Sequence, residues 1–176
     1  GFVDITNQAD DITMSYNVFE RHNKAILIGN SDAKTADDGK LNVTLHHNYF
    51  YNLVQRVPRV RWGKVHVYNN YYQTDEDNGG YRYAYSLGVG KNSKIYAENN
   101  VADIDGRTYQ DFVKVFGGTE LTTLNNIFNG EKIDTFNEHL SPVTWTPERH
   151  MKIDDVNEVK AKVLQQAGVF KEAVTP

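Results

Sequence analysis

Cysteine is absent from the 176 residues, and proline and tryptophan are scarce, with four and two copies. The lack of cysteine excludes disulfide scaffolds and cysteine-ligated zinc sites. No apolar run approaches the ~18 residues that a membrane-spanning helix needs, so we expect no membrane partner. No basic segment followed by an apolar stretch opens the chain, so any secretion signal lies upstream or has been removed.

Overall charge is slightly acidic. The chain has 19 Lys and Arg against 23 Asp and Glu, a formal net charge of -4 and a pI of about 5.8. This balance argues against nucleic acid as a partner. With 39% hydrophobic and 24% charged residues the composition is globular, and the length suits a single domain over residues 1–176.

A short motif recurs five times: an alternating strand, an asparagine, and an aromatic residue two positions later. The segments are ITMSYNVF, VTLHHNYF, VHVYNNYY, IYAENNVA and LTTLNNIF, and their aligned asparagines are Asn17, Asn48, Asn70, Asn100 and Asn126. The intervals are 31, 22, 30 and 26 residues, and only Ala102 breaks the aromatic position. Such repeats are too short to close their own cores, so neighbouring units must stack.

Stacked asparagines favour a solenoid. The Asn amide can bond to the Asn above and below it, and Asn tolerates the left-handed backbone of a turn. The repeat therefore predicts an all-β fold, a right-handed parallel β-helix with an asparagine ladder, over residues 1–128. An antiparallel sandwich with Asn at its turns is the alternative.

The end of the chain has a different pattern. Residues 129–153 contain two prolines and are expected to be loop-rich, whereas apolar residues at helical spacing predict an amphipathic helix over residues 154–169. Asp154 or Asp155 can cap its start and Gly168 its end. We expect this helix to pack on the solenoid with its lysines in solvent. The residues expected on its apolar side are Val156, Val159, Val163, Leu164 and Ala167.

Positive charge collects in one segment, QRVPRVRWGK at residues 55–64, which contains no acid. Pro58 cannot donate a ladder hydrogen bond, so Arg56 is expected in the loop before a strand. Arg59 and Arg61 then share one face of that strand, outside the solenoid. After Gly63 the alternation of inward and outward side chains shifts by one residue, which predicts a corner there.

The repeat brings a second cation to the same place. Lys24 follows Asn17 by 7 residues and Arg56 follows Asn48 by 8, so the two should be near neighbours on adjacent coils. Together with Arg61 they would form a cationic ridge, which suggests an anionic ligand such as a polyanionic saccharide. The alternative is a solvated basic face paired with Asp32, Asp37 or Asp38. His46 and His47 are expected to be packed rather than catalytic.

Three segments resemble pectate lyases of polysaccharide lyase family 1: HNKAILIGNSD, LHHNYFYNLVQRVPRVRWGKVHVYNNYY and YSLGVGKNSKIYAENN. The resemblance runs from Gly1 to about residue 170, and its RxPRxR segment is highly specific. It implies a right-handed parallel β-helix and a secreted, calcium-dependent enzyme. Such enzymes cleave (1→4)-α-D-galacturonan by β-elimination and leave 4,5-unsaturated ends.

By the same resemblance, Arg56 matches the catalytic base, Lys24 and Arg61 match residues that hold the substrate carboxylate, and Arg59 is a supporting substrate-binding residue. Asp4 matches the last Asp of a DGxxD pattern, which is a Ca²⁺ ligand.

The first Asp of that pattern belongs immediately before Gly1, and the family's earlier acidic ligands are absent. The sequence is thus similar to only the C-terminal part of a pectate lyase. We therefore expect the other half of the β-helix as a partner, either in a longer parent or as a second chain, besides the polygalacturonate substrate. A non-catalytic polyanion-binding solenoid and a pectin lyase-like enzyme remain alternatives.

Overall fold

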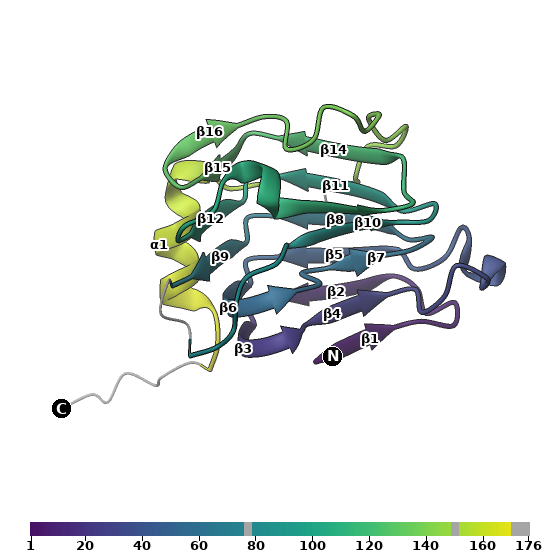
Figure 1. The fold of residues 1–176 in the computed structure, drawn as a ribbon, viewed down its shortest axis with the longest axis horizontal. Helices are drawn as coiled ribbons and strands as arrows, with labels where there is room; N and C mark the ends of the chain where they lie inside the picture. The colour runs from purple at the N-terminus through teal and green to yellow at the C-terminus, as the bar shows by residue number, and fades with distance from the viewer. Residues whose placement is uncertain (76–78, 149–151, 170–176) are drawn as a thin grey trace.

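Short parallel strands dominate the computed structural model, which describes residues 1–75, 79–148 and 152–169 (Figure 1). The strands form three sheets, named A, B and C below, and each coil adds one strand to B, then C, then A. About four such turns stack as a right-handed parallel β-helix. The described strands of successive coils all pair in parallel, so the antiparallel sandwich is wrong. No described helix is long and apolar enough to cross a bilayer.

The strands have the following bounds. Sheet A contains β1 (Val3–Ile5), β4 (Ile26–Ile28), β7 (Arg59–Val60), β10 (Leu87–Gly90) and β13 (Val113–Phe116). Sheet B contains β2 (Ile12–Ser15), β5 (Val43–His46), β8 (Lys64–Tyr68), β11 (Lys94–Glu98) and β14 (Glu120–Leu124). Sheet C contains β3 (Val18–Lys24), β6 (Tyr49–Gln55), β9 (Tyr71–Thr74), β12 (Val101–Ile104), β15 (Asn126–Phe128) and β16 (Glu131–Ile133). Two short 3₁₀ segments, η1 (Thr35–Asp37) and η2 (Tyr109–Phe112), lie in the loops.

The asparagine ladder is confirmed, and it stands at the corner between sheets B and C. Each ladder amide Nδ2 donates to the Oδ1 of the next asparagine at 3.0 to 3.1 Å, from Asn17 through to Asn126. The same oxygens accept the backbone N–H of the preceding ladder residue. The left-handed residue is the one before each ladder asparagine, such as Tyr16 (φ 56°) and His47 (φ 53°), and not the asparagine itself. The ladder residues therefore serve hydrogen bonding, and their predicted left-handed role is wrong.

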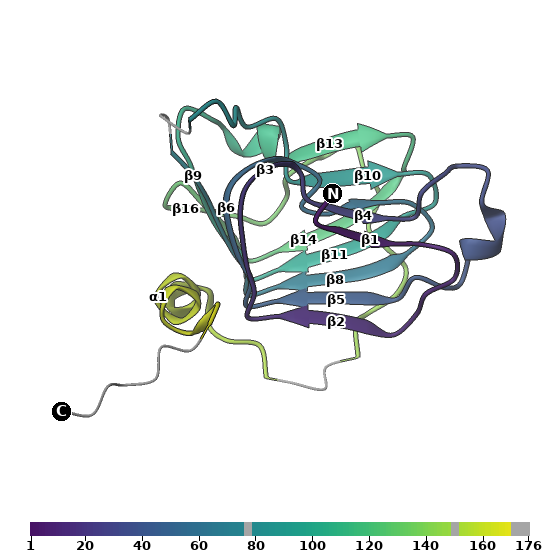
Figure 2. The same cartoon turned by 90° about the horizontal axis from the view of Figure 1, so that it is seen from below.

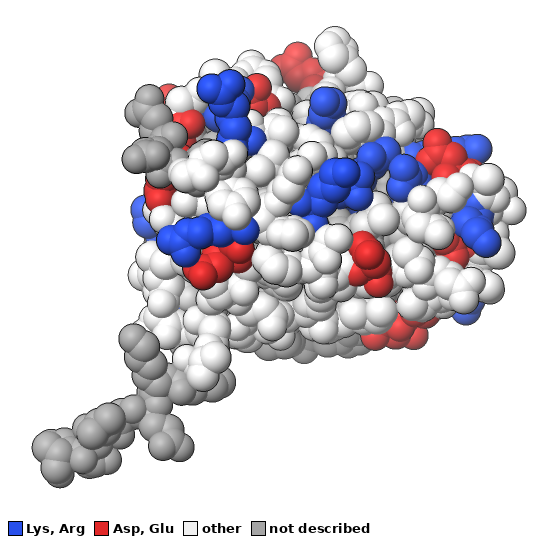
Figure 3. All heavy atoms as spheres, turned by 60° about the horizontal axis from the view of Figure 1, so that its bottom comes forward, with Lys and Arg blue, Asp and Glu red and all other residues white. Residues whose placement is uncertain are grey.

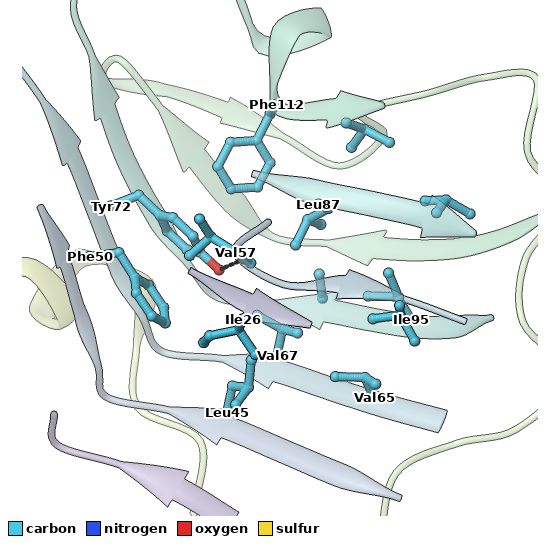
Figure 4. Close-up of a cluster of buried hydrophobic side chains, with 14 of the residues drawn as sticks. Ile26, Leu45, Phe50, Val57, Val65, Val67, Tyr72, Leu87, Ile95 and Phe112 are labelled. Carbon is cyan, nitrogen blue, oxygen red and sulfur yellow. Dashed lines mark hydrogen bonds between the residues drawn. The ribbon is translucent and has the colours of Figure 1, made fainter. Parts of the chain in front are cut away.

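Aromatic side chains two positions after the ladder stack inside the solenoid. Phe19 stacks on Phe50 with centroids 5.4 Å apart, and Phe50 packs on Tyr72 at 4.9 Å. Ala102 leaves a gap in this stack, and Phe112 from η2 fills it, with its ring 5.0 Å from Tyr72. Figure 4 shows Phe50, Tyr72 and Phe112 in succession in the core, with the Tyr72 hydroxyl donating to the carbonyl of Val57.

The C-terminal helix α1 (Val156–Gln166) lies against the outside of sheet C (Figure 2). Asp155 caps its start by accepting from the N–H of Asn157, and Gly168 follows its end with φ 98°. Val156, Val159 and Val163 are buried against Tyr71 and Val101 as predicted. Leu164, however, is exposed.

Two further expectations about the C-terminal part need more detail. Lys160 is exposed but also bonds Asp103 at 2.5 Å, and Lys162 is half-buried and bonds Asp154. The segment expected to be loop-rich also contains the short strand β16, which pairs antiparallel with β15 and ends sheet C.

His46 and His47 are buried, as predicted, and connect the solenoid to α1. The Asp154 carboxylate only accepts, so His47 donates to it from Nε2 at 2.8 Å and accepts at Nδ1 from the Nδ1–H of His46, also at 2.8 Å. Burial, together with the neighbouring His47 and His66, lowers the pKa of His46 to about 4. His46 is therefore neutral in the folded protein at pH 7.

The ladder position determines how much each asparagine stabilises the fold. Asn70 is fully buried and its side chain bonds two backbone carbonyls and two ladder partners, whereas Asn17 is exposed at the ladder's end. We expect Asn70→Ala to lower the free energy of unfolding by about 3 kcal/mol, because it leaves buried groups unpaired. Asn17→Ala, the matched control, should cost less than about 1 kcal/mol. Urea unfolding checks this, and equal losses for the two variants would contradict the ladder's role.

Acid should destabilise the fold through His46. Because its folded pKa of about 4 lies below the ordinary histidine pKa of 6.5, the unfolded chain binds a proton more readily between these two values. Stability is thus full above pH 6.5 and falls by up to about 3 kcal/mol as pH drops through 4. His46→Asn keeps a donor at the Nδ1 position and should flatten this dependence. His139→Asn, at an exposed position, should leave it unchanged, and denaturant unfolding at several pH values measures both.

Candidate functional site

Arg56 lies at the corner where the chain leaves sheet C and enters sheet A, directly after β6. It adopts a left-handed backbone (φ 63°), which is uncommon for arginine. Its carbonyl accepts from the N–H of Ile26 at 2.7 Å, so the backbone at this corner is bonded to the preceding coil. Its placement in the loop before β7 was predicted from Pro58 and is confirmed.

Lys24 occupies the same corner one coil earlier. The register pairs Lys24 with Gln55, and the N–H of Ala25 donates to the Gln55 carbonyl at 3.1 Å. Arg56 is therefore one residue out of register with Lys24, on the adjacent strand. Lys24 is exposed and makes no ion pair with any described residue.

Arg59 and Arg61 lie on the outer face of sheet A, as the alternation predicted, while Val60 and Trp62 are buried on the inner side. Trp62 and Gly63 then form the corner that leads into β8. Arg61 is held by two contacts: Nε donates to Asp32 at 2.7 Å, and Nη1 donates to the Gly29 carbonyl at 3.0 Å. Its side chain also passes over Gly90, where an added Cβ would lie 3.0 Å from the Arg61 Cγ.

The arginines are only partly compensated by acidic groups. Of the three acids expected to pair with them, Asp32 does so, but Asp37 accepts from the Gln8 N–H and Asp38 from Asn92. Neither Arg56 nor Arg59 has a carboxylate within 4 Å among the described residues, and the Nε of each is buried without a hydrogen-bond partner. Burial lowers the pKa of Arg59, and the charges of Arg61 and Arg56 lower it further.

We refer to Lys24, Arg56, Arg59 and Arg61 as the basic patch. Figure 3 shows a connected group of lysine and arginine side chains near the centre of one face, bordered by separate acidic residues. The charges of Arg61 and Arg56 both lower the pKa of Arg59, so these like charges are close enough to repel. An anionic ligand would relieve this repulsion, so the patch is suited to bind a polyanion.

Asp4 lies on β1, at the outer face of sheet A, paired with Leu27 in the row that continues to Arg59. Its carboxylate lies near the carbonyls of Lys24 and Ala25, since a Cβ on Gly1 would lie within 3.3 Å of all three. Ca²⁺ takes six to eight oxygen ligands. In residues 1–75, 79–148 and 152–169 no three His, Cys, Asp or Glu side chains gather as metal ligands. These residues alone therefore do not fit a complete calcium site.

Two aromatic residues near the patch were missed by sequence reasoning. Phe116 lies under the guanidinium of Arg59, with the ring centroid 4.0 Å from Cζ, and Tyr85 packs on Phe116 at 5.3 Å. Burial raises the pKa of Tyr85, while Arg59 and Arg56 oppose this. Tyr85 opens one of the segments that carry the resemblance, but its sequence does not show this packing, and Phe116 meets Arg59 across two coils.

A groove of about 570 Å³ lies elsewhere, outside sheet B. It is lined by Thr13, Thr44 and His66 from three successive strands, and by Trp145 from the C-terminal segment. None of the predicted site residues lines it. The concentration of unpaired charge, rather than cavity volume, therefore identifies the candidate site.

Comparisons with known proteins agree on one family. Residues 1–171 match the family model described as pectate lyase. The chain is 48% identical to a pectate lyase of Bacillus subtilis (strain 168) over 174 residues, which is 97% of this chain and 41% of that relative. It is 34% identical to pectate lyase A of Emericella nidulans over 172 residues, 96% of this chain and 47% of the relative.

Solved structures show the same relationship. A pectate lyase bound to a hexasaccharide matches with a TM-score of 0.90 and 48% identity, over 94% of this chain and 42% of that one. A pectate lyase from Bacillus sp. N165 in complex with trigalacturonate matches with a TM-score of 0.71 and 27% identity, over 95% and 52%. This chain thus spans about half the length of these relatives, or less.

Proposed function

Because this chain belongs to the pectate lyase family, we propose that it forms the catalytic arginine part of a calcium-dependent lyase acting on (1→4)-α-D-galacturonan. The observation that carries the proposal is the basic patch, in which Lys24, Arg56 and Arg59 have no carboxylate partner among the described residues. A polymer with one carboxylate on every sugar is the complementary ligand. The relative that binds trigalacturonate supports this choice of sugar.

In the proposed reaction the uncharged guanidine form of Arg56 is the general base. It removes the proton at C5 of a galacturonate residue, the C5–H electron pair forms the C4–C5 double bond, and the bond from C4 to the glycosidic oxygen breaks. The departing oxygen takes up a proton, which leaves one new reducing end and one 4,5-unsaturated end. Lys24 and Arg61 hold the carboxylate next to C5 and stabilise the negative charge that develops there.

The proposed Ca²⁺ dependence rests on the family and on Asp4. Asp4 would supply one ligand, and the others would come from residues outside this chain. The partners are thus the polygalacturonate substrate and the rest of a longer β-helix. We further propose an extracellular location, because a galacturonan polymer is met outside the cell.

Two other functions make different predictions. A non-catalytic solenoid would bind polygalacturonate through the same patch without producing unsaturated ends. A pectin lyase-like enzyme would cleave methylated polymer without calcium, but neutral esters would not use the unpaired cations of the patch. The patch therefore favours the acidic substrate.

Replacing the base should separate binding from catalysis. We would use a chimera in which this chain replaces the matching part of the Bacillus subtilis relative, and follow the absorbance of the unsaturated product from polygalacturonate with Ca²⁺. Arg56→Lys keeps the charge but changes the base, so kcat should fall by at least ~100-fold while KM changes little. Arg21→Lys, at an exposed arginine of β3 paired with Glu20, is the control.

The outcomes of this assay discriminate among the functions. Turnover that survives Arg56→Lys would remove Arg56 from the mechanism. Binding of polygalacturonate with no turnover in the parent chimera would support the binding module, and calcium-independent cleavage of methylated polymer would support the pectin lyase-like alternative.

Calcium binding by the chain alone should be weak. The Asp4 carboxylate alone does not provide the six to eight oxygen ligands that Ca²⁺ requires, and no three His, Cys, Asp or Glu side chains gather as ligands among the described residues. Calorimetry should therefore show no saturable site tighter than ~1 mM. In the chimera a tighter site should appear, and Asp4→Asn should weaken it. A tight site in the isolated chain that Asp4→Asn abolishes would mean that this chain completes the coordination itself.

A further inference from the structure

Arg59 and Arg61 stand two residues apart on one face, yet they are fixed in different ways. Arg61 is fixed by hydrogen bonds to Asp32 and Gly29. Arg59 has no such acceptor among the described residues, and its buried Nε is unpaired. An arginine side chain that is not held in place would lose conformational entropy on binding a ligand. The contacts that hold Arg59 therefore matter for binding.

The path of the Arg59 side chain shows what holds it. Arg59 pairs with Gly88 in β10, and Gly88 pairs with Lys114 in β13. A Cβ on Gly88 would lie 2.9 Å from Cγ of Arg59 and 3.0 Å from the Tyr85 ring. The missing side chain of Gly88 therefore lets Arg59 cross β10 towards the next coil.

The guanidinium ends on an aromatic surface. Its Cζ lies 4.0 Å from the centroid of Phe116, well within the range of a cation–π contact. Tyr85 supports that ring from the side at 5.3 Å. Lys114 lies 5.6 Å from the same ring, so two cations contact Phe116. The backbones of Arg59 and Phe116 are two strands apart, which is ~9.6 Å along the solenoid axis.

We propose that Phe116 and Gly88 are positioning residues that hold the Arg59 guanidinium outward, so that Arg59 binds a second carboxylate of the polyanion beside the one held by Lys24 and Arg61. This inference rests on the proposed function. An aromatic face fixes the guanidinium without using its N–H donors, and although Nε is buried, the Nη groups can still donate to a carboxylate. Lys114, 5.6 Å from the Phe116 ring, adds a further positive charge near it.

The test uses the chimera with polygalacturonate. Phe116→Leu removes the ring's attraction for the cation and should raise KM about five- to tenfold, with kcat unchanged because Arg56 is not disturbed. Phe116→Tyr should restore the parent KM. Gly88→Ala should raise KM in the same way by displacing Arg59. Tyr96→Leu, an aromatic substitution on sheet B, is the control.

A double variant distinguishes positioning from general destabilisation. If Phe116 acts through Arg59, then Phe116→Leu combined with Arg59→Lys should be no worse than the stronger single variant. Fully additive effects, or Phe116→Leu with an unchanged KM, would overturn the proposal.

Direct binding separates this inference from the proposed function. Calorimetric titration of the parent chimera with polygalacturonate should show binding that Phe116→Leu weakens by the same factor as KM. Absence of binding by the parent would refute the proposed function itself. Binding that is equal in the parent and in Phe116→Leu would refute only the role of Phe116.

Discussion

One repeated contact keeps the coils in register: a buried asparagine amide that bonds the asparagine of the next coil. The ladder fixes the corner between sheets B and C, and β3 and β6 run from it in continuous register from Val18 opposite Tyr49 to Lys24 opposite Gln55. The position of Lys24 against the Arg56 corner is thus set by amides at the other end of the two strands. Without that register the cations would not share one face.

Much of this arrangement is predictable because it repeats in the sequence. The spacing of the asparagines predicts the solenoid, and Pro58 and Gly63 locate the loop and the corner on either side of β7. What repeats less is not predicted. The left-handed residues before the ladder asparagines vary in type, from Tyr16 and His47 to Asn69, so their conformation has no uniform residue signal.

Contacts that cross coils are the ones that sequence reasoning missed. Phe112 fills the space over Ala102 because a loop reaches back into the core, which no local pattern shows. The contact of Arg59 with Phe116 likewise depends on where a long side chain turns after leaving its strand, whereas the pairing of Arg61 with Asp32 is one of the alternatives that the sequence offered. The residue types of the basic patch could therefore be predicted, but not how each is held.

That difference has a physical consequence for the site. Asp32 fixes Arg61 but also offsets part of its charge, although its exposure to solvent weakens the effect. Phe116 fixes Arg59 without adding negative charge, so the positive potential over sheet A is preserved while the geometry is constrained. The alternation of β10 places Gly88 and Gly90 on the same outer face, one beneath each arginine side chain. The coil after the arginines thus contributes space at Gly88 and Gly90, and this space lets the two arginine side chains pass over the outer face of sheet A.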